Sequence, residues 1–323
     1  MKNIAIVAGG DSSEFEVSLK SAKGLVGFID PDRYHRYIVV IRNGKWTVQL
    51  PDGEGEADVD KNDFSFQFRG GKIKFDYAYN TIHGRPGEDG RLQGYFDLLG
   101  IPYSSCGVLA AALTFNKYMN NQFLKTQGVR VSDSVRLTER QAWDTDDIIR
   151  RLGLPVFVKP NDGGSSFGIT KVKESAQMKS AIEKAFGEGR EVIVERFVEG
   201  TEVTCGCCKT RTRQVVFPVT EVVSDNEFFD FNAKYNGEVQ EITPARISDE
   251  LTTVIQQETL RIYDLVGARG IIRIDYIIPA DNQPVLLEVN TNPGMTATSF
   301  IPQQIKAAGL NIKDIMTEII ENI

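Results

Sequence analysis

The feature of this chain that most constrains its fold is the alternating segment at residues 271–290. Apolar and polar side chains alternate on both sides of a loop at 280–283, which predicts an antiparallel hairpin. Burial of the apolar side chains selects a register in which Pro279 faces Pro284, or one two residues away, because a slip of one residue would mix the two faces. The apolar face would then consist of Ile272, Ile274, Tyr276, Ile278, Val285, Leu287 and Val289.

The opposite face of the predicted hairpin gathers polar side chains. Asp275 would face Glu288, and Arg273 would face Asn290, with opposed Cβ atoms roughly 5 Å apart. Two opposed carboxylates repel, and a bound Mg²⁺ would offset the repulsion because it prefers carboxylate and amide oxygens. The pattern alone leaves two other interpretations open: a solvated charged face, or a carboxylate pair neutralised by Arg273.

A glycine- and serine-rich loop after a predicted strand at 155–160 is a second candidate site. Residues 161–168 can present successive backbone N–H groups to anionic oxygens, because glycine permits close approach. Lys159 would add a cation beside them. The Gly-Lys-Ser/Thr ending of a Walker A loop is absent, so a plain turn stays open as the alternative. Gly9-Gly10 likewise lacks the G-x-G-x-x-G dinucleotide fingerprint.

The remaining pattern predicts an α/β beginning followed by an α+β end. Strands and helices interleave early, and antiparallel strands dominate late. The expected elements that bear on the site are a strand at 4–8, a helix capped by Asp11, Ser12 or Ser13, a helix over 108–125, a strand over 215–223, and loops over 52–63 and 224–246.

Composition narrows the class of protein. The 323 residues carry 37 Lys and Arg against 44 Asp and Glu, a net charge of −7, which argues against a nucleic-acid partner. No run approaches the roughly 18 apolar residues of a membrane span. The apolar part of the N-terminus is too short for a signal peptide. A chain of this length is expected to hold two or three domains.

The four cysteines indicate the compartment. Cys205, Cys207 and Cys208 lie too close together for a disulfide framework, and a soft-metal cluster is the alternative. Val203, Cys205 and Cys207 alternate along a predicted strand, which favours buried, reduced thiols. Reduced thiols and the missing signal peptide together predict a cytoplasmic protein.

Taken together, the chain resembles the D-alanine–D-alanine ligases. The motifs that carry the resemblance occur in family order at residues 9–18, 83–90, 159–160, 163–168, 233–235, 273–276 and 287–296. The resemblance implies an ATP-grasp fold, in which an α/β Rossmann-like domain at 1–104 precedes two α+β domains at 105–196 and 197–323. The loop at about 224–246 would be the lid.

The resemblance also implies a reaction. ATP-dependent ligation of two D-alanines would give D-alanyl-D-alanine for peptidoglycan synthesis, through an acyl phosphate. The implied cofactors are ATP and two Mg²⁺ ions, with Mn²⁺ as a substitute and a monovalent cation as an activator. The implied assembly is a homodimer without a nucleic-acid or membrane partner.

The family's substrate-binding roles transfer to matching positions. Glu14 would hold the ammonium of the first D-alanine, and Ser165 and Tyr235 would form a hydrogen-bonded triad with it. His83 would lie near the first carboxylate. Further implied roles are an oxyanion site at Arg273 and the Gly294 N–H, and binding of the second D-alanine by Ser299 beside Phe300.

The nucleotide-binding roles transfer in the same way. The phosphates of ATP would contact Lys117, Lys159, Lys234 and the loop residues Ser165 and Ser166. Adenine and ribose would be bound by Glu195, Arg196, Val198 and Glu202. The metal ligands would be Asp275, Glu288 and Asn290, the last of which also contacts the nucleotide. For each of these residues an ordinary structural or surface role is the alternative.

The chain departs from the family pattern at several positions, and three other functions are weighed against the ligase. Asp162 stands in the phosphate loop where the family is often basic, and Phe300 replaces a common leucine. The nearest rival is a D-alanine–D-lactate ligase, against which Ala233-Lys234-Tyr235 favours an amine nucleophile. A non-catalytic nucleotide-binding module would be expected to lack Arg273 or the carboxylates. A nicotinamide-dependent dehydrogenase would need the missing glycine fingerprint.

Overall fold

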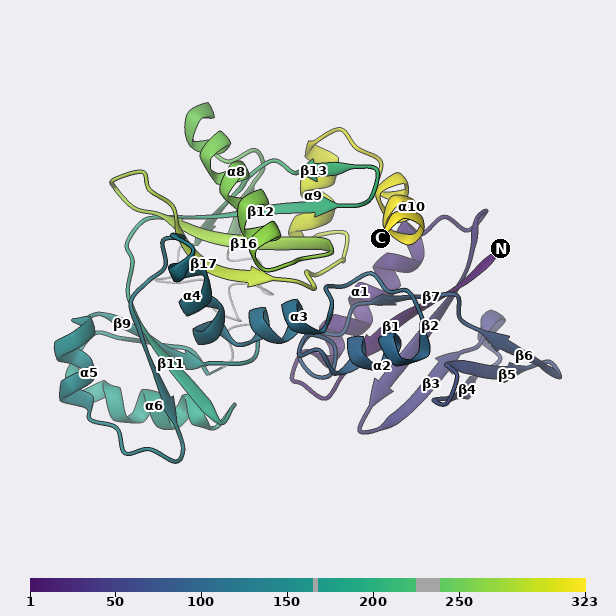
Figure 1. The fold of residues 1–323 in the computed structure, drawn as a ribbon, viewed down its shortest axis with the longest axis horizontal. Helices are drawn as coiled ribbons and strands as arrows, with labels where there is room; N and C mark the ends of the chain where they lie inside the picture. The colour runs from purple at the N-terminus through teal and green to yellow at the C-terminus, as the bar shows by residue number, and fades with distance from the viewer. Residues whose placement is uncertain (165–167, 225–238) are drawn as a thin grey trace.

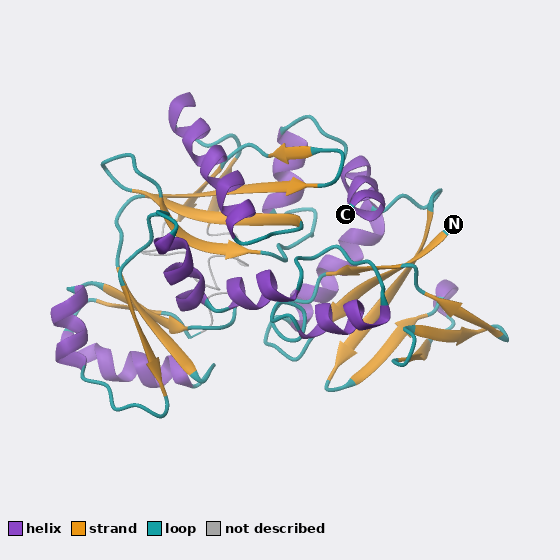
Figure 2. Ribbon diagram, in the orientation of Figure 1, coloured by secondary structure: helices purple, strands orange, loops and turns teal. Residues whose placement is uncertain are grey.

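The computed structural model describes residues 1–164, 168–224 and 239–323, and it contains three β-sheets (Figure 1). Helices lie against each sheet, and α3 (Val108–Phe115) and α4 (Lys117–Thr126) run through the middle of the molecule (Figure 2). The sheets fall one each into the ranges 1–104, 105–196 and 197–323. The fold class predicted from the sequence is confirmed, while the domain boundaries at 104 and 196 stay a prediction.

The N-terminal sheet has the order β6-β5-β4-β3-β2-β1-β7. Its core is a Rossmann-like unit, because β1 pairs in parallel with both β2 and β7 and α1 crosses between β1 and β2. The elements are β1 (Lys2–Gly9), α1 (Phe15–Phe28), β2 (Tyr34–Arg42), β3 (Lys45–Gln49), β4 (Glu56–Asp60), β5 (Ser65–Phe68), β6 (Gly71–Lys74), β7 (Tyr77–Asn80) and α2 (Arg91–Leu99).

The start of α1 differs from the prediction. The helix begins at Phe15, so Glu14 occupies the N-cap position, and the three predicted capping residues precede it. Gly9 and Gly10 have φ values of +100° and +98°, which carry the chain past Ile41 before the helix can start. This loop places Glu14 at the N-terminus of α1, where Glu14 is 7% exposed.

The predicted acidic loop at 52–63 is wrong, because Glu56–Asp60 forms strand β4. Val59 is buried in this strand, whereas its acidic neighbours point to solvent. The high density of charge hides the alternation of a half-buried strand. Charged side chains on such a strand also oppose pairing with another chain.

The central sheet is antiparallel, with the order β10-β9-β11-β8. Two helices cover one of its faces, and Val156, Val158, Val192 and Val194 pack against them in a separate hydrophobic cluster. The elements are β8 (Ser134–Thr138), α5 (Thr145–Leu152), β9 (Val156–Pro160), β10 (Thr170–Val172), α6 (Met178–Phe186) and β11 (Glu191–Arg196).

The C-terminal sheet has the order β15-β14-β12-β16-β17, with β13 paired to β12. Ser248 caps α8 by accepting the Leu251 N–H at 3.2 Å, as predicted. The elements are β12 (Thr201–Lys209), β13 (Gln214–Val216), β14 (Thr220–Ser224), β15 (Val239–Ile242), α8 (Asp249–Leu265), β16 (Gly270–Ile278), β17 (Val285–Asn290), α9 (Phe300–Ala307) and α10 (Ile312–Asn322).

Two long predicted elements are each divided. The helix expected over 108–125 breaks at Asn116, whose side chain accepts the Met119 N–H at 2.9 Å and starts a new helix. The strand expected over 215–223 is split into β13 and β14 around the buried Phe217. The loop expected over 224–246 contains β15, and residues 225–238 of it lie outside the described part of the chain.

The hairpin predicted at residues 271–290 is present, but it contains a bulge. Asp275 pairs with Glu288 as predicted, but Tyr276 pairs with Leu286, so the register shifts by one residue. Leu286 therefore packs in the core and Leu287 faces the neighbouring pocket. The predicted pairing of Pro279 with Pro284, and the predicted burial of Leu287 in the core, are wrong for this reason.

The cysteines of β12 are buried, as the alternation predicted. Cys205 and Cys207 are fully buried in one core cluster, and Cys208 belongs to the cluster on the other face of the strand. All four cysteines are free thiols. Among residues 1–164, 168–224 and 239–323, no three His, Cys, Asp or Glu side chains converge as a metal cluster. No helix in these same ranges is both long and apolar enough for a membrane span.

Candidate active site

Two adjoining cavities lie where the three sheets approach one another. One, of about 500 Å³, lies between the central and the C-terminal sheets. The other, of about 730 Å³, lies between α1 and the segment from Glu288 to Phe300. Both are lined by Glu14, Lys117, Arg273 and Glu288, so the smaller, nucleotide-sized cavity opens directly onto the larger one.

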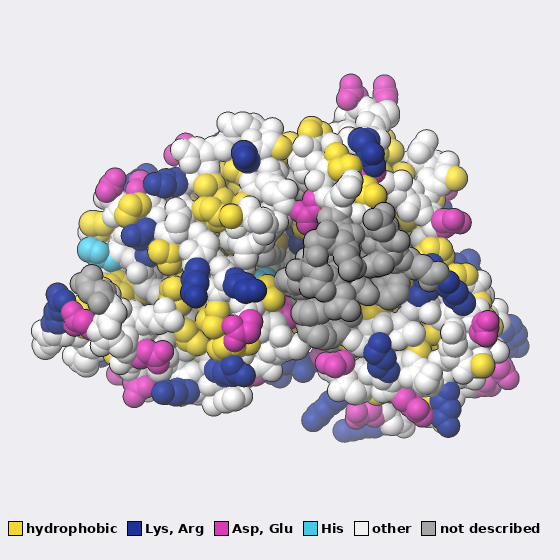
Figure 3. Space-filling view, turned by 180° about the vertical axis from the view of Figure 1, so that it is seen from behind, with side chains coloured by type: hydrophobic (Ala, Val, Ile, Leu, Met, Phe, Trp, Pro, Cys, Tyr) yellow, Lys and Arg dark blue, Asp and Glu magenta, His cyan; other side chains and the backbone are white. Residues whose placement is uncertain are grey.

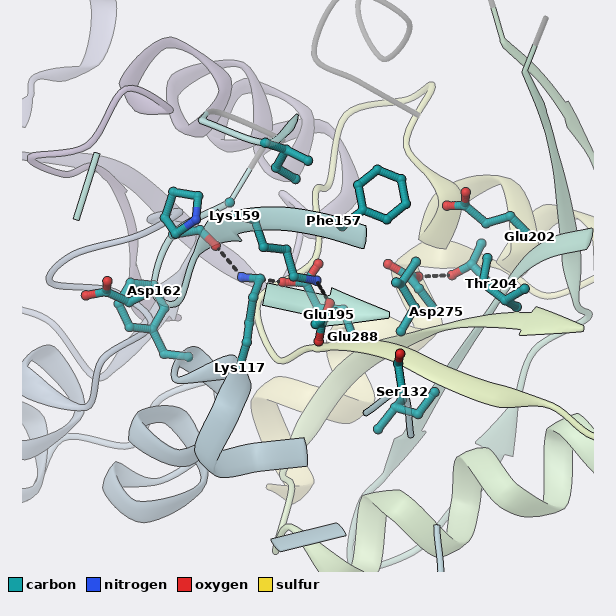
Figure 4. A pocket seen from close by; sticks show the side chains of 18 of the residues that line it. Lys117, Ser132, Phe157, Lys159, Asp162, Glu195, Glu202, Thr204, Asp275 and Glu288 are labelled. Carbon is teal, nitrogen blue, oxygen red and sulfur yellow. Dashed lines mark hydrogen bonds and ion pairs between the residues drawn. The ribbon is translucent and has the colours of Figure 1, made fainter. Parts of the chain in front are cut away.

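Two buried lysines point into the smaller cavity (Figure 4). Lys159, on β9, forms an ion pair with Glu195 of β11 at 2.6 Å. Lys117, the first residue of α4, donates to the Gly163 carbonyl at 2.6 Å and pairs with Glu288 at 2.8 Å. Burial alone would lower the pKa of Lys117, but the Glu288 carboxylate reverses this and raises it. The Lys117 ammonium is therefore held charged beside the loop at 161–164, and Lys159 lies on the strand that leads into this loop.

The break before α4 fixes the position of that loop. Asn161 accepts the Lys117 N–H on its carbonyl at 3.0 Å and the Tyr118 N–H on its side chain at 2.8 Å. The N-terminus of α4 is thus tied directly to the glycine-rich segment. Ser165 and Ser166, predicted to contact phosphate, lie outside the described residues, as do Lys234 and Tyr235.

The polar face of the hairpin forms the opposite wall. Arg273 donates two hydrogen bonds to the Asp275 carboxylate, at 2.8 and 2.9 Å, and Asn290 donates a third at 2.9 Å. Thr204 adds another at 2.6 Å, visible in Figure 4. Asp275 and Glu288 therefore do stand side by side, with Arg273 and Lys117 offsetting their charge.

This wall fits a hard divalent cation. Asp275, Glu288 and Asn290 present two carboxylates and one amide oxygen across from the lysines, and Mg²⁺ prefers this oxygen set when it is completed by phosphates. Neutralisation by Arg273, the interpretation left open by the sequence, holds for Asp275 at the same time. The two Asp275 oxygens accept four hydrogen bonds, from Arg273, Thr204 and Asn290, so a cation at Asp275 would replace one of them.

Residues predicted to bind the first substrate meet in the larger cavity. Glu14 lies so close to the loop that a Cβ on Gly164 would be 2.7 Å from its carboxylate oxygen. His83 is 8% exposed, and within the described part of the chain its Nε2 has no hydrogen-bond partner. Burial lowers the pKa of His83, and Arg273 acts in the same direction while Glu14 opposes it.

The segment predicted to bind the second substrate is held against α1. Met295 N–H donates to Ser21 at 3.3 Å, and a Cβ on Gly24 would be 2.3 Å from the Met295 carbonyl oxygen. Ser299 is the N-cap residue of α9, but its hydroxyl accepts the Thr296 N–H at 3.0 Å instead of capping the helix. The segment containing Gly294 is therefore held against the middle of α1, and Gly294 and Glu14 line the same cavity.

An aromatic contact completes this end of the cavity. The Arg273 guanidinium lies 5.0 Å from the centre of the Phe300 ring. Phe300, which replaces a leucine common in the family, thus packs on Arg273.

The predicted adenine end is mostly apolar. Phe157, Val198, Leu287 and Ile277 line it, together with Glu195 and Glu202. Arg196 also lines this cavity, and its guanidinium donates to the Leu152 carbonyl at 2.9 Å. Leu287 reaches this wall only because of the bulge, so the sequence pattern did not reveal it.

Glu88 is a site residue that the sequence analysis missed. It lines the larger cavity and accepts the Gly84 N–H at 2.6 Å. Burial, followed by the Glu14 charge, raises the pKa of Glu88 to about 8. Its position inside the motif at 83–90 was the available signal.

Glu88 gives a first prediction. The folded chain keeps a proton on Glu88 that the unfolded chain releases near its ordinary pKa of 4.5, so folding becomes less favourable as pH rises towards about 8. We expect Glu88→Gln to remove this loss, so that the melting temperature of the variant exceeds that of wild type increasingly from about pH 5 to pH 8. If the melting temperatures of wild type and Glu88→Gln changed in parallel with pH, the raised pKa of Glu88 would be contradicted. The control is Glu56→Gln, at an exposed site, whose melting temperature should follow that of wild type at every pH.

Fold and site together define an ATP-grasp enzyme. A cavity between the central and the C-terminal sheets, lined by two buried lysines and closed by oxygen ligands, is the arrangement that this class uses for ATP.

Comparison with known proteins specifies the family. Models of the N-terminal and C-terminal parts of D-ala D-ala ligases match residues 3–106 and 123–321. A D-alanine–D-alanine ligase of Parabacteroides distasonis is 65% identical, covering 99% of this chain and 97% of the relative. The chain therefore belongs to the D-alanine–D-alanine ligase family, whose members are ATP-dependent ligases.

Solved structures agree with this assignment. The VanG D-Ala:D-Ser ligase of Enterococcus faecalis superposes with a TM-score of 0.86 at 32% identity, over 99% of this chain and 98% of that one. The D-alanine–D-alanine ligase of Bacillus anthracis complexed with ATP gives a TM-score of 0.78 at 26% identity, over 99% and 97%. The likeness to both structures extends over nearly the whole chain.

Proposed function

We propose that this chain joins two D-alanines to D-alanyl-D-alanine at the expense of ATP, through an acyl phosphate, and that it supplies peptidoglycan synthesis in the cytoplasm. The observation that carries the proposal is the meeting of Asp275 and Glu288 with Lys117 at the junction of the two cavities. That junction is where a nucleotide phosphate and an amino-acid carboxylate would come together.

ATP would lie in the smaller cavity, with adenine on its apolar wall and the phosphates between Lys117, Lys159 and the loop at 161–164. Lys234, Ser165 and Ser166 join this set on the resemblance alone. Asp275, Glu288 and Asn290 would hold two Mg²⁺ ions, or Mn²⁺ in their place, whose chemistry is to neutralise phosphate oxygens. A monovalent cation is a further expectation from the family.

The first D-alanine would bind with its ammonium at Glu14 and its carboxylate near His83. The buried imidazole nitrogen without a partner in the described chain supports this placement. The γ-phosphoryl group would then pass from ATP to that carboxylate, with charge neutralised by the lysines. Ser165 and Tyr235 would complete the family's triad with Glu14.

The second D-alanine would bind at Ser299 and Phe300 with its amine towards the acyl phosphate. Its ammonium would first lose a proton to the surrounding water; the neutral nitrogen would then attack the carbonyl carbon, and the tetrahedral intermediate would lose a second proton to water and expel phosphate. Arg273 and the Gly294 N–H would stabilise the negative oxygen of that intermediate. The two hydrogen bonds from Arg273 to Asp275 support this role, because they fix the guanidinium before substrate arrives.

The test is an assay of phosphate release with ATP, Mg²⁺ and D-alanine, with the product identified by mass. We expect D-alanyl-D-alanine and one ADP for each dipeptide. Release of phosphate only after D-lactate is added would overturn the proposal in favour of a depsipeptide ligase.

The proposal includes a homodimer and no nucleic-acid or membrane partner. Basic and acidic side chains are interspersed on the face shown in Figure 3, which is unlike a nucleic-acid surface. Leu98 of α2 and Leu109 of α3 are 89% and 80% exposed on helices that contact each other. An exposed apolar patch of this kind supports association with a second copy.

The patch gives a second prediction. The double variant Leu98→Asp, Leu109→Asp should be monomeric, because the charges would be buried unpaired in the interface while costing little in the exposed monomer. Sedimentation velocity measures the mass directly. Leu154→Asp, a substitution at another exposed leucine, should leave the dimer intact. An unchanged mass for the double variant would place the interface elsewhere.

A further inference from the structure

A carboxylate in the larger cavity has no role in the reaction as described so far. In the described part of the chain this cavity is lined by the acidic residues Glu14, Glu88, Glu241 and Glu288. Glu14 and Glu88 lie on the first-substrate side, and Glu288 pairs with Lys117 at 2.8 Å. Glu241 comes instead from β15, inside the range 224–246 predicted for the lid, and the family motifs do not include it.

The strand register directs Glu241 to the catalytic side of its sheet. Glu241 pairs with Val222, and Val222 pairs with Glu202 of β12. Glu202 in turn pairs with Ile277 of β16, which shares a strand face with Arg273 and Asp275. Directly paired residues project to the same face, so Glu241 lies on the face that carries the oxyanion and metal residues.

A contact with α9 fixes Glu241 beside the second-substrate segment. Gln303 donates one hydrogen bond to the Glu241 carboxylate and another to the Thr298 carbonyl at 2.8 Å. Thr298 directly precedes Ser299, so the carboxylate stands next to the residues proposed to bind the second D-alanine. Burial raises the pKa of Glu241, and the Gln303 hydrogen bond and the Arg273 charge oppose that shift.

The cavity is complementary to a zwitterion. Lys20 and Lys23 of α1 line the same cavity and supply positive charge for a carboxylate. Glu241 supplies negative charge on the side of β15. A D-amino acid carries both charges, whereas a 2-hydroxy acid of the same shape carries only the carboxylate. The negative charge of Glu241 would therefore favour a D-amino acid over a 2-hydroxy acid as the nucleophile.

We propose that Glu241 is a specificity-determining residue, whose carboxylate receives the ammonium of the second substrate and so selects amino acids over 2-hydroxy acids. The inference rests on the proposed function, because it assigns a residue to the second site of that reaction. Glu241 would contact the nitrogen of the second substrate before that nitrogen loses its proton and attacks, so its effect is on binding and orientation.

The test is Glu241→Gln, which removes the charge but keeps an acceptor for Gln303. We expect the KM of the second D-alanine to rise about 10- to 100-fold, as for loss of a hydrogen bond to a charged group, with the first-site KM unchanged. In mixtures of D-alanine and D-lactate at fixed pH, the mass-resolved product should shift towards the depsipeptide. Glu241→Asp keeps the charge and should restore part of the preference. A merely structural role would not separate the two KM values.

The controls separate this inference from the proposed function. Glu250→Gln removes an exposed carboxylate at the start of α8 and should behave as wild type. If wild type forms no dipeptide, the proposed function itself fails. If wild type forms dipeptide and Glu241→Gln matches it in second-site KM and in product ratio, the role of Glu241 is overturned and the function stands.

Discussion

Replacing Glu288 by Gln should lower D-alanine-dependent ATP turnover by about 1,000-fold, equivalent to roughly 4 kcal/mol of transition-state stabilisation. Two physical reasons combine. The variant loses one of the two carboxylates that would hold the metal ions against the phosphates. It also removes the partner of Lys117, whose ammonium is kept charged in a buried setting by that carboxylate. The measurement is the initial rate of ATP turnover by wild type and variant at saturating ATP and Mg²⁺. The affinity of each protein for the nucleotide is measured separately.

The comparison that isolates the metal role is Glu288→Asp. Asp retains the charge and hence the pair with Lys117, although it retracts the oxygens from the cavity. We expect the melting temperature of Glu288→Asp to lie closer to that of wild type than the melting temperature of Glu288→Gln does. The turnover of Glu288→Asp should still be impaired. Turnover by Glu288→Gln at the wild-type rate would exclude Glu288 as a metal ligand.

The sequence predicted this part of the site because its determinants are local. Alternation between apolar and charged residues is enough to pair Asp275 with Glu288 once one face must be buried. The same reasoning failed at Leu287, because a bulge inserts one residue without leaving a periodic signal. The pattern therefore did not predict that Leu287 lines the smaller cavity, although it did predict the pairing of Asp275 with Glu288.

Asn116 illustrates a different limit. Apolar residues continue at helical spacing across it, so the pattern predicts one helix over 108–125. The break depends on Asn161, which lies far away in the chain and receives the first N–H groups of α4. A helix end that is stabilised by a distant loop is visible only in the folded chain. This break also brings Lys117 to the glycine-rich loop, where it donates to the Gly163 carbonyl.

Glu88 and Glu241 show the same dependence on tertiary structure. Each is an ordinary acidic residue in the sequence, one among 44 Asp and Glu. Their significance comes from which cavity encloses them and which groups face them there. Resemblance to a family identifies positions that its motifs share, and Glu241 lies outside those motifs.

The second large prediction concerns Arg273. Its guanidinium makes a two-bonded contact with Asp275 and packs on Phe300, which fixes it where a negative oxygen would develop. Lys keeps the charge but cannot reproduce the fork of donors. Arg273→Lys should therefore bind ATP as wild type does and lose about 100- to 1,000-fold in dipeptide formation, the cost of one oxyanion donor.

The two large predictions differ in the step they affect, which makes them separable. Loss of Glu288 should prevent phosphoryl transfer, so ADP and dipeptide fall together. Loss of the Arg273 fork should spare phosphoryl transfer and impair the attack of the amine, so the acyl phosphate has time to hydrolyse. Single-turnover experiments on Arg273→Lys should then release more ADP than dipeptide. Equal yields of the two products at the reduced rate would contradict an oxyanion role and leave Arg273 as the partner that orders Asp275.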